Sequence, residues 1–366
     1  MSKKIVFYTM AMRKGGSERV ISNLTNYLAS NNYEVFLICN LFEESFYKLN
    51  KKVKYINLDK NVIKNKFQYF YRKISSKRTK NLKKILDKIH PDLIVAFLPE
   101  PSLRCLKNKK YKTIISERCD PNVEYSNFLL RKYMKKLFKL ADGFIFQTND
   151  AQKYFENIIN CNYEIIPNPV NDNFFCKKYQ GKDSSSISTV GRLSKQKNQK
   201  LLIDSFAEFN KQYPEFTLKI YGEGKLLKKL KEHTQRKGIK DKVKFMGVDD
   251  NLQNKLIYDK FFVLTSNYEG MPNALMEAMA LGLPCISTNC PVGGPKMLIS
   301  HLENGLLVPV KNKNEIVKAM KMLVKDEKLC KKISENSIKI ISEKYNTSFI
   351  MKKWENYFLK IMEVKK

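Results

Sequence analysis

The sequence has 366 residues, of which 43% are hydrophobic and 28% are charged. This composition excludes extensive disorder, and the length favours two domains of roughly 150 to 200 residues each. The net charge of +32 excludes an acidic surface and predicts attraction to phosphate-bearing partners, although a general bias toward lysine along the whole chain explains the charge equally well.

The sequence gives no sign of export or of metal binding. No apolar run approaches the roughly 18 residues that a membrane-spanning helix needs, and the apolar stretch at residues 5–9 is too short for a signal peptide. The 8 cysteines include no C-x-x-C pair, and with 3 histidines they offer no zinc-site spacing. We therefore expect a cytoplasmic protein with reduced thiols and no bound metal.

Short apolar runs alternate with helical patterns in the first half of the chain. This alternation is typical of βαβ units and a parallel sheet. A helix between the first two runs has its apolar face formed by Val20, Ile21, Leu24 and Leu28. The predicted strands cover Ile5–Thr9, Val35–Cys39, Leu93–Leu98, Thr113–Ser116, Phe144–Gln147 and Glu164–Ile166.

The alternation breaks near Pro167–Pro169, and the polar stretch 177–186 has the composition of a linker. It then restarts. We expect a first domain at 1–170, a second at 171–345 and a C-terminal helix at 346–366 that packs back toward the first domain. The predicted strands of the second domain cover Ser186–Gly191, Thr217–Tyr221, Val243–Met246, Phe261–Thr265, Cys285–Ser287 and Leu306–Val308.

Two such halves predict an α/β fold with two Rossmann-like, doubly wound parallel sheets. Ligands bind sheets of this kind outside the carboxyl ends of the strands. We therefore expect the two domains to face each other across a cleft that contains the functional site.

The first strand is followed by a loop that carries Gly15 and Gly16. Small residues between a strand and a helix let a phosphate approach backbone N–H groups at the helix N-terminus. The loop lacks the G-x-G-x-x-G pattern of dinucleotide enzymes, and Asn40 stands where an acidic residue would hold an NAD ribose. A tight turn without a ligand explains the glycine pair equally well.

The segment 269–277 follows a buried strand and carries two glutamates. Glu269 lies in a loop, and Glu277 lies about one turn into the next helix, which Gly282 ends. Two carboxylates that flank the N-terminus of a helix suit a nucleotide sugar, because this ligand has hydroxyls at both ends and phosphates between them. Either glutamate alone is equally explained by stabilisation from the helix dipole. The N–H groups between them, aimed at an anion, belong to Gly270, Met271, Asn273 and Ala274.

Arg192 and Lys197 lie where the first strand of the second domain gives way to a helix. Arginine binds a diphosphate as a fork and lysine as a point charge. Such cations stabilise negative charge on a departing phosphate without a metal. As isolated features, they are equally consistent with two solvated surface cations.

Taken in order, these motifs make a family resemblance plain. The chain resembles the retaining GT-B glycosyltransferases of family 4, and the resemblance spans almost the whole sequence. The last of its four motifs is specific, whereas the glycine-rich ones are not. The motifs are Gly-Gly-Ser-Glu-Arg at 15–19, Gly-Arg-Leu-x3-Lys-Asn at 191–198, Tyr-Gly-Glu-Gly at 221–224 and Glu-x7-Glu at 269–277.

The resemblance implies a nucleotide-sugar donor, expected to be UDP-linked, and no cofactor. It implies that Arg192 and Lys197 hold the donor diphosphate, that Glu269 contacts the sugar hydroxyls and that Glu277 holds the ribose. The first three would be the catalytic residues. Further implied donor contacts are Gly15, Gly16, Gly222, Gly247, Val248, Gly270, Met271, Asn273 and Ala274.

A segment at the end of a first-domain strand supplies candidates for the acceptor side. These are Glu117, Arg118 and Asp120. Many similar family members have a histidine where this chain has Arg118, so a histidine-dependent role is not expected here.

Within the family, the chain most resembles bacterial enzymes that add N-acetylhexosamine to lipid-linked oligosaccharides. The pieces Ser45–Leu49, Ile115–Glu117 and Pro291–Pro295 prompt this match. The expected partners are a nucleotide sugar and a glycan acceptor, carried on polyprenyl diphosphate, in surface polysaccharide or glycoconjugate biosynthesis.

An anionic membrane is a further expected partner, on the inner face of the cytoplasmic membrane. The stretches Phe67–Lys88 and Phe128–Leu140 mix aromatic or aliphatic residues with many cations, as interfacial helices do. The same apolar residues are also explained if they face the sheet and leave a solvated lysine face outside.

Two other functions fit parts of the sequence. A nucleic-acid-binding protein fits the charge, but no RNA- or DNA-binding motif is visible, so we expect no nucleic-acid partner. An epimerase-like enzyme that acts on sugar nucleotides without an acceptor fits the donor motifs, and it would release free sugar or isomerised nucleotide.

Overall fold

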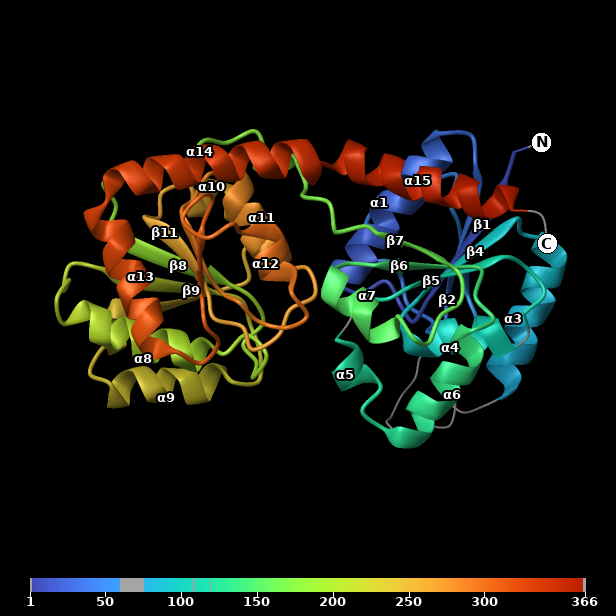
Figure 1. Ribbon diagram of the computed structural model, residues 1–366, viewed down its shortest axis with the longest axis horizontal. Coiled ribbons are helices and arrows are strands. Elements are labelled where there is room, and N and C mark those ends of the chain that lie inside the picture. Colours follow the sequence, from blue (N-terminus) through green and yellow to red (C-terminus); the bar gives the residue numbers. More distant parts are fainter. Residues whose placement is uncertain (1, 60–75, 108, 119, 365–366) are drawn as a thin grey trace. The chain divides into compact units, whose positions relative to one another are not determined.

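The computed structural model describes residues 2–59, 76–107, 109–118 and 120–364. The chain divides into two compact units, residues 1–168 with 350–366 and residues 169–349 (Figure 1). Each unit contains a parallel sheet with its own hydrophobic core.

The first unit contains a seven-stranded sheet in the order β3-β2-β1-β4-β5-β6-β7, and every neighbouring pair is parallel. The order reverses between β1 and β4, so the sheet is doubly wound. The six predicted strands are confirmed, and the edge strand β3 adds one that was not predicted. The strands are β1 (Lys4–Thr9), β2 (Glu34–Cys39), β3 (Lys54–Asn57), β4 (Leu93–Phe97), β5 (Thr113–Ser116), β6 (Gly143–Phe146) and β7 (Asn162–Ile165).

Helices cover both faces of the first sheet. The predicted apolar face of α1 is buried, and α15 adds Trp354 and Phe358 to the same core. Figure 1 shows α3, α4 and α6 on the opposite side of the sheet from α1 and α15. The helices are α1 (Gly16–Ser30), α3 (Ser76–Ile89), α4 (Pro99–Lys107), α5 (Pro121–Glu124), α6 (Phe128–Phe138), α7 (Asn149–Phe155) and α15 (Thr347–Glu363).

The second unit contains a six-stranded parallel sheet in the order β10-β9-β8-β11-β12-β13. Its order reverses between β8 and β11, which marks the point where ligands bind such sheets. All six strands match predicted runs. They are β8 (Ser186–Val190), β9 (Thr217–Tyr221), β10 (Val243–Gly247), β11 (Phe261–Leu264), β12 (Cys285–Thr288) and β13 (Leu306–Val308).

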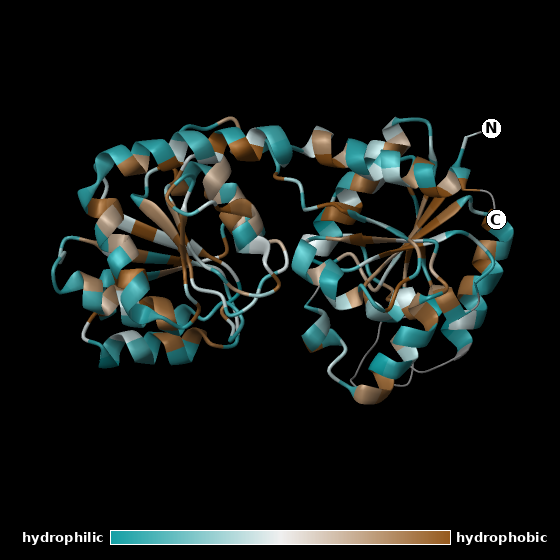
Figure 2. Ribbon diagram, viewed as in Figure 1, coloured by the Kyte–Doolittle hydropathy of each residue, from teal (hydrophilic) through white to brown (hydrophobic). Residues whose placement is uncertain are grey.

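Helices also surround the second sheet, and two buried clusters fill the space between them and the strands. Figure 2 shows hydrophobic residues concentrated in the strands and on the helix sides that face them. The two doubly wound α/β sheets predicted from the sequence are therefore confirmed. The helices are α8 (Gln199–Asn210), α9 (Leu227–Arg236), α10 (Leu252–Leu256), α11 (Asn273–Ala280), α12 (Gly294–Leu298), α13 (Lys313–Lys325) and α14 (Glu327–Lys344).

Membrane-spanning helices were not expected from the sequence. Among the described residues, none of the helices combines the length and the apolar character needed to cross a bilayer.

The carboxyl group of Glu117 lies in the interior of the first unit, directly after β5. The residue is 2% exposed, and the hydroxyl of Tyr125 donates a hydrogen bond to its Oε1 at 2.9 Å. Tyr125 in turn packs edge-on against Phe138 and Phe155, so these surroundings are largely apolar. Burial raises the pKa of Glu117 to about 7, because the charged form loses its hydration.

Removal of this charge is predicted to stabilise the fold at alkaline pH. Between its ordinary pKa of 4.5 and the folded value of about 7, the unfolded chain releases the proton while the folded chain keeps it, so stability falls as pH rises. Glu117→Gln keeps an acceptor oxygen for Tyr125. We expect it to raise the free energy of unfolding by about 1–3 kcal/mol at pH 8, with a smaller gain at pH 5. Urea denaturation at both pH values measures this, and an identical pH dependence in the two proteins would contradict it.

Candidate active site

Three glycines join neighbouring strand ends at the carboxyl edge of the second sheet. The N–H of Gly191 donates to the carbonyl of Tyr221 at 3.0 Å, and the N–H of Gly222 donates to the carbonyl of Gly247 at 2.6 Å. A Cβ on Gly222 would lie 2.2 Å from the carbonyl oxygen of Gly191, and its φ of +123° also disfavours a side chain. The ends of β8, β9 and β10 are therefore close enough for one ligand to span them.

Arg192 follows β8 in a loop whose backbone is fixed from both sides. The side-chain amide of Gln199 donates to the carbonyl of Arg192 at 2.9 Å, and the N–H of Leu193 donates to the carbonyl of Glu223 at 2.9 Å. The Arg192 side chain itself is exposed. An anion at this edge can thus reach its guanidinium without rearrangement of the loop.

Lys197 and Glu269 form an ion pair between the loops that follow β8 and β11. The Lys197 Nζ lies 2.5 Å from Glu269 Oε1, and the two side chains are 18% and 6% exposed. The hydroxyl of Ser266 donates to the same oxygen at 2.6 Å. Charged partners in a site with little water interact strongly, so this pair fixes both side chains in place.

The loop that carries Glu269 rests on the loop after β12. The N–H of Glu269 donates to the carbonyl of Pro291 at 2.6 Å, and the N–H of Val292 donates to the carbonyl of Glu269 at 2.9 Å. A Cβ on Gly294 would lie 1.6 Å from the carbonyl oxygen of Gly270, so only glycine allows this close approach. The segment Pro291–Pro295 therefore holds the backbone of Glu269 and Gly270 in place.

Helix α11 begins next to this loop. The Pro272 carbonyl accepts hydrogen bonds from the N–H groups of Leu275 and Met276, which starts the helix at Asn273. Glu277 lies in its second turn and is buried. The first N–H groups of a helix have no partners within the helix, and they favour an anion at this end.

The structure thus places the predicted second-domain residues at one edge of one sheet. Met271 is buried and Val248 is exposed beyond the end of β10. The predicted residues are Arg192 and Lys197 after β8, Gly222 after β9, Val248 after Gly247 at the end of β10, Glu269, Gly270 and Met271 in the loop after β11, and Asn273, Ala274 and Glu277 in α11. Ser266 belongs to this group and was not predicted, because a serine after a strand is too common to stand out.

Gly15 lies in the first unit between β1 and α1, and Gly16 is the first residue of α1. Gly15 is fully extended, with φ −168° and ψ 164°, and it precedes the first helical residue. These glycines therefore lie where the first strand gives way to the first helix, as the sequence predicts.

Arg118 points into the first unit, where its side chain is buried. Its guanidinium lies 4.9 Å from the ring of Trp354, and its Nε and Nη1 donate to Ser116 Oγ at 2.8 Å and Asn168 Oδ1 at 3.1 Å. Asp120 caps α5 by accepting from the N–H of Asn122 at 2.9 Å. Both residues therefore have structural contacts, and of the three acceptor-side candidates only Asp120 is partly exposed.

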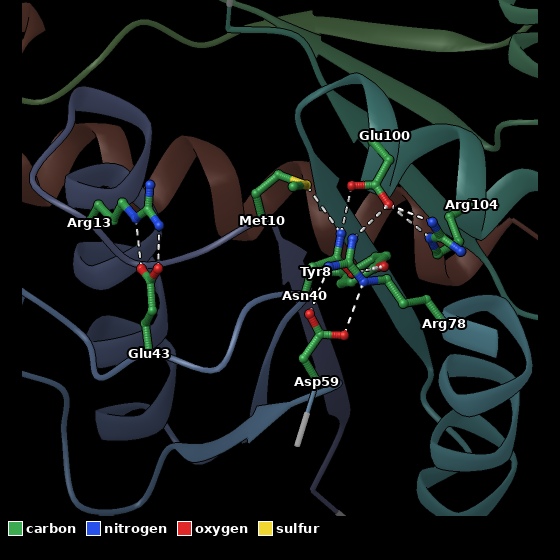
Figure 3. Close-up of polar contacts among 9 residues, drawn as sticks. All are labelled: Tyr8, Met10, Arg13, Asn40, Glu43, Asp59, Arg78, Glu100 and Arg104. Carbon is green, nitrogen blue, oxygen red and sulfur yellow. Dashed lines mark hydrogen bonds and ion pairs between the residues drawn. The ribbon is translucent and has the colours of Figure 1, made fainter. Parts of the chain in front are cut away.

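The sequence analysis missed a buried polar network at the carboxyl edge of the first sheet (Figure 3). Asn40 Oδ1 accepts from the Tyr8 hydroxyl at 2.5 Å, and Asn40 Nδ2 donates to Glu100 Oε2 at 2.8 Å. Arg104 donates to Glu100 Oε1 through Nε at 3.1 Å and Nη2 at 2.6 Å. The sequence signal that could have indicated this network is the polar residues that directly follow apolar strands.

A second pair extends this network. Arg78 Nη2 and Nε donate to the two carboxylate oxygens of Asp59 at 2.7 and 3.2 Å, and both side chains are buried. The two arginines and two carboxylates balance in charge. A buried network of this kind fixes α3 and α4 against the sheet, because loss of one partner would leave a buried charge.

Two sequence families match the chain. Residues 172–340 match the family described as "Glycosyl transferases group 1", and residues 14–174 match "Glycosyltransferase Family 4". Their boundary lies within a few residues of the boundary between the two units at 168 and 169.

Three similar proteins come from bacteria. An uncharacterized glycosyltransferase of Haemophilus influenzae is 29% identical over 96% of this chain and 99% of its own length. The GalNAc-alpha-(1->4)-GalNAc-alpha-(1->3)-diNAcBac-PP-undecaprenol alpha-1,4-N-acetyl-D-galactosaminyltransferase of Campylobacter jejuni is 28% identical over 96% of this chain and 97% of its own. Anabaena HepE, solved in complex with UDP, has the same fold, with a TM-score of 0.80 and 18% identity over 98% of this chain and 100% of its own. The chain therefore belongs to the group 1, or family 4, glycosyltransferases of the GT-B fold, and it is an enzyme that transfers a sugar from a nucleotide sugar.

Proposed function

We propose that the chain transfers a hexose or N-acetylhexosamine from a UDP-sugar to a glycan acceptor carried on polyprenyl diphosphate, with retention of the anomeric configuration. The observation that carries this proposal is the Lys197–Glu269 pair, at a sheet edge that also presents Arg192 and a helix N-terminus. The acceptor named for the Campylobacter relative supports the acceptor class, and the UDP complex of HepE supports the donor. Such a reaction belongs to surface polysaccharide or glycoconjugate biosynthesis.

The proposed roles follow from charge and position. Arg192 and Lys197 bind the diphosphate and stabilise the negative charge that develops on UDP as it departs. The hydrogen bonds from Lys197 and Ser266 are both accepted by Glu269 Oε1, so we assign Oε2 to a hydroxyl of the transferred sugar. Because these groups are held before the donor binds, little reorganisation is needed during the reaction.

The nucleotide is assigned to the remaining loops. Glu277 accepts hydrogen bonds from the ribose hydroxyls. The base lies beside Gly247 and Val248, because Val248 exposes apolar surface there. The diphosphate lies on the start of α11. The assigned backbone contacts are Gly222, Gly270, Met271, Asn273 and Ala274, and Gly15 and Gly16 are proposed as further donor contacts.

The proposed reaction needs neither a divalent metal nor a cofactor. Two cations, Arg192 and Lys197, supply the positive charge that Mg²⁺ would otherwise bring to the diphosphate. The acceptor is assigned to the end of β5. Asp120 is partly exposed there, and the buried residues Glu117 and Arg118 support this segment from the interior of the unit.

Lys197→Ala is predicted to lower the rate of transfer about a hundredfold, because one charge-stabilising contact is lost. Lys200→Ala is the matched control, since Lys200 lies nearby in α8 and is exposed. Both are assayed with a panel of UDP-, GDP- and ADP-sugars and a polyprenyl-diphosphate acceptor, in buffer that contains EDTA. Thermal unfolding establishes that both variants are folded.

Wild-type rates in a folded Lys197→Ala variant would contradict the proposed site. Wild-type transfer that disappears in EDTA and returns with Mg²⁺ would contradict the metal-independent reaction. Isomerised nucleotide formed without an acceptor would indicate the epimerase-like alternative.

We further propose that α6 docks on an anionic membrane, on the inner face of the cytoplasmic membrane. Phe128 and Leu129 are 68% and 73% exposed at the start of the helix, and Leu140 is exposed beyond its end. Met134 and Phe138, two apolar residues of the same predicted stretch, are instead buried in the core. Residues 67–75 of the other predicted stretch lie outside the described residues. The exposed cations of this region are Arg131, Lys132, Lys135, Lys136 and Lys139.

The four lysines of this patch are predicted to hold the protein on anionic vesicles at low salt. Each contributes about 1 kcal/mol near such a surface, so together they change partitioning nearly a thousandfold. A variant with Lys132, Lys135, Lys136 and Lys139 replaced by Gln is compared with one in which exposed Lys328, Lys331, Lys339 and Lys344 of α14 are replaced. Both variants lose the same charge.

Vesicle sedimentation at low and high salt measures the binding, which salt should weaken. We expect the α6 variant to stay in the supernatant and the α14 variant to sediment with the vesicles. Equal sedimentation of the two variants would contradict docking through α6.

A further inference from the structure

The segment after β2 lies along the loop that carries Gly15 and Gly16. The N–H of Phe46 donates to the carbonyl of Met12 at 2.8 Å, and the Lys14 Nζ lies 5.3 Å from the centre of the Phe46 ring. Glu43 pairs with Arg13 through both carboxylate oxygens, as Figure 3 shows. The conformation of the glycine loop therefore depends on residues 43–47.

Tyr47 makes the most specific of these contacts. Its hydroxyl donates to the carbonyl of Gly15 at 2.7 Å and accepts from the N–H of the same residue at 3.1 Å. A fully extended residue directs its N–H and C=O to the same side, as in a hydrogen-bonded pair of antiparallel strands. One phenol can therefore hold both groups of Gly15 and fix its extended conformation.

The glycine loop needs such an external contact. Two consecutive glycines lose more conformational entropy on ordering than any other pair of residues. Gly15 precedes the first residue of α1 and offers no side chain to cap the helix. The Tyr47 hydroxyl bonds the backbone of Gly15 itself, so it restrains the residue that directly precedes the helix.

Tyr47 is itself held in place. Its ring packs edge-on against Phe46, with 5.2 Å between ring centres, and the Ser45 hydroxyl donates to its carbonyl at 2.8 Å. Burial raises the pKa of Tyr47, so the hydroxyl keeps its proton and can donate throughout the physiological range. The phenol is therefore a fixed support for Gly15.

We propose that Tyr47 is a positioning residue for sugar transfer, which acts by holding Gly15 and Gly16 in the geometry that meets the donor. This inference rests on the proposed function, in which these glycines contact the nucleotide sugar. Tyr47 does not touch the substrate. Because most donor contacts belong to the second unit, loss of the Tyr47 hydroxyl affects turnover more than donor binding.

Tyr47→Phe tests this proposal, because it removes the hydroxyl and keeps the aromatic packing. We expect kcat to fall about tenfold while the KM for the donor changes less than about twofold, since a small misplacement of a contact group costs rate. Tyr33→Phe is the matched control. It also loses a half-buried hydroxyl in the first unit, where Tyr33 donates to Glu355 at 3.0 Å, and its kcat should stay at the wild-type value.

Two further measurements separate positioning from general stability. Hydrogen exchange at residues 15–17 should become faster in Tyr47→Phe and not in Tyr33→Phe, while the two unfold at similar temperatures. Gly15→Ala, which adds a methyl group at the residue that Tyr47 holds, should also lower kcat, because the proposed function places the donor against this residue.

Wild-type kcat in Tyr47→Phe, or unchanged hydrogen exchange at residues 15–17, would overturn the role of Tyr47. Absence of transfer by the wild-type enzyme from every nucleotide sugar would instead contradict the proposed function. The two failures are thereby distinguished.

Discussion

The ion pair between Lys197 and Glu269 is the contact on which the candidate site depends. It joins loops from β8 and β11, the two strands between which the order of the second sheet reverses. A charged pair with little exposure is costly to bury unless its geometry is fixed. The hydrogen bond from Ser266 and the support from Pro291 and Val292 provide that geometry. The site is therefore organised before a ligand binds.

The fold was largely predictable, because strands buried on both faces of a parallel sheet appear as continuous apolar runs. The strand β3 was missed for a physical reason. It lies at the edge of its sheet, and in Lys-Tyr-Ile-Asn none of the four residues is fully buried. Its composition therefore resembles that of a loop.

The candidate site was predictable only in part. Motifs at strand ends could be assigned to one edge, because all carboxyl ends of a parallel sheet meet there. The pairing of Lys197 with Glu269 could not be predicted, because 72 residues separate them and no local pattern specifies which lysine approaches which carboxylate. The inward orientation of Arg118 was hidden for the same reason, since Trp354 and Asn168 are distant in sequence.

The central claim is that the carboxyl edge of the second sheet binds the nucleotide sugar. A crystal structure of the enzyme with bound UDP-sugar tests it most directly. The account predicts the diphosphate within hydrogen-bonding distance of Arg192 and Lys197, the sugar on Glu269 and the ribose on Glu277. A nucleotide bound elsewhere, with Lys197 still paired only to Glu269 and no phosphate near either cation, would contradict it.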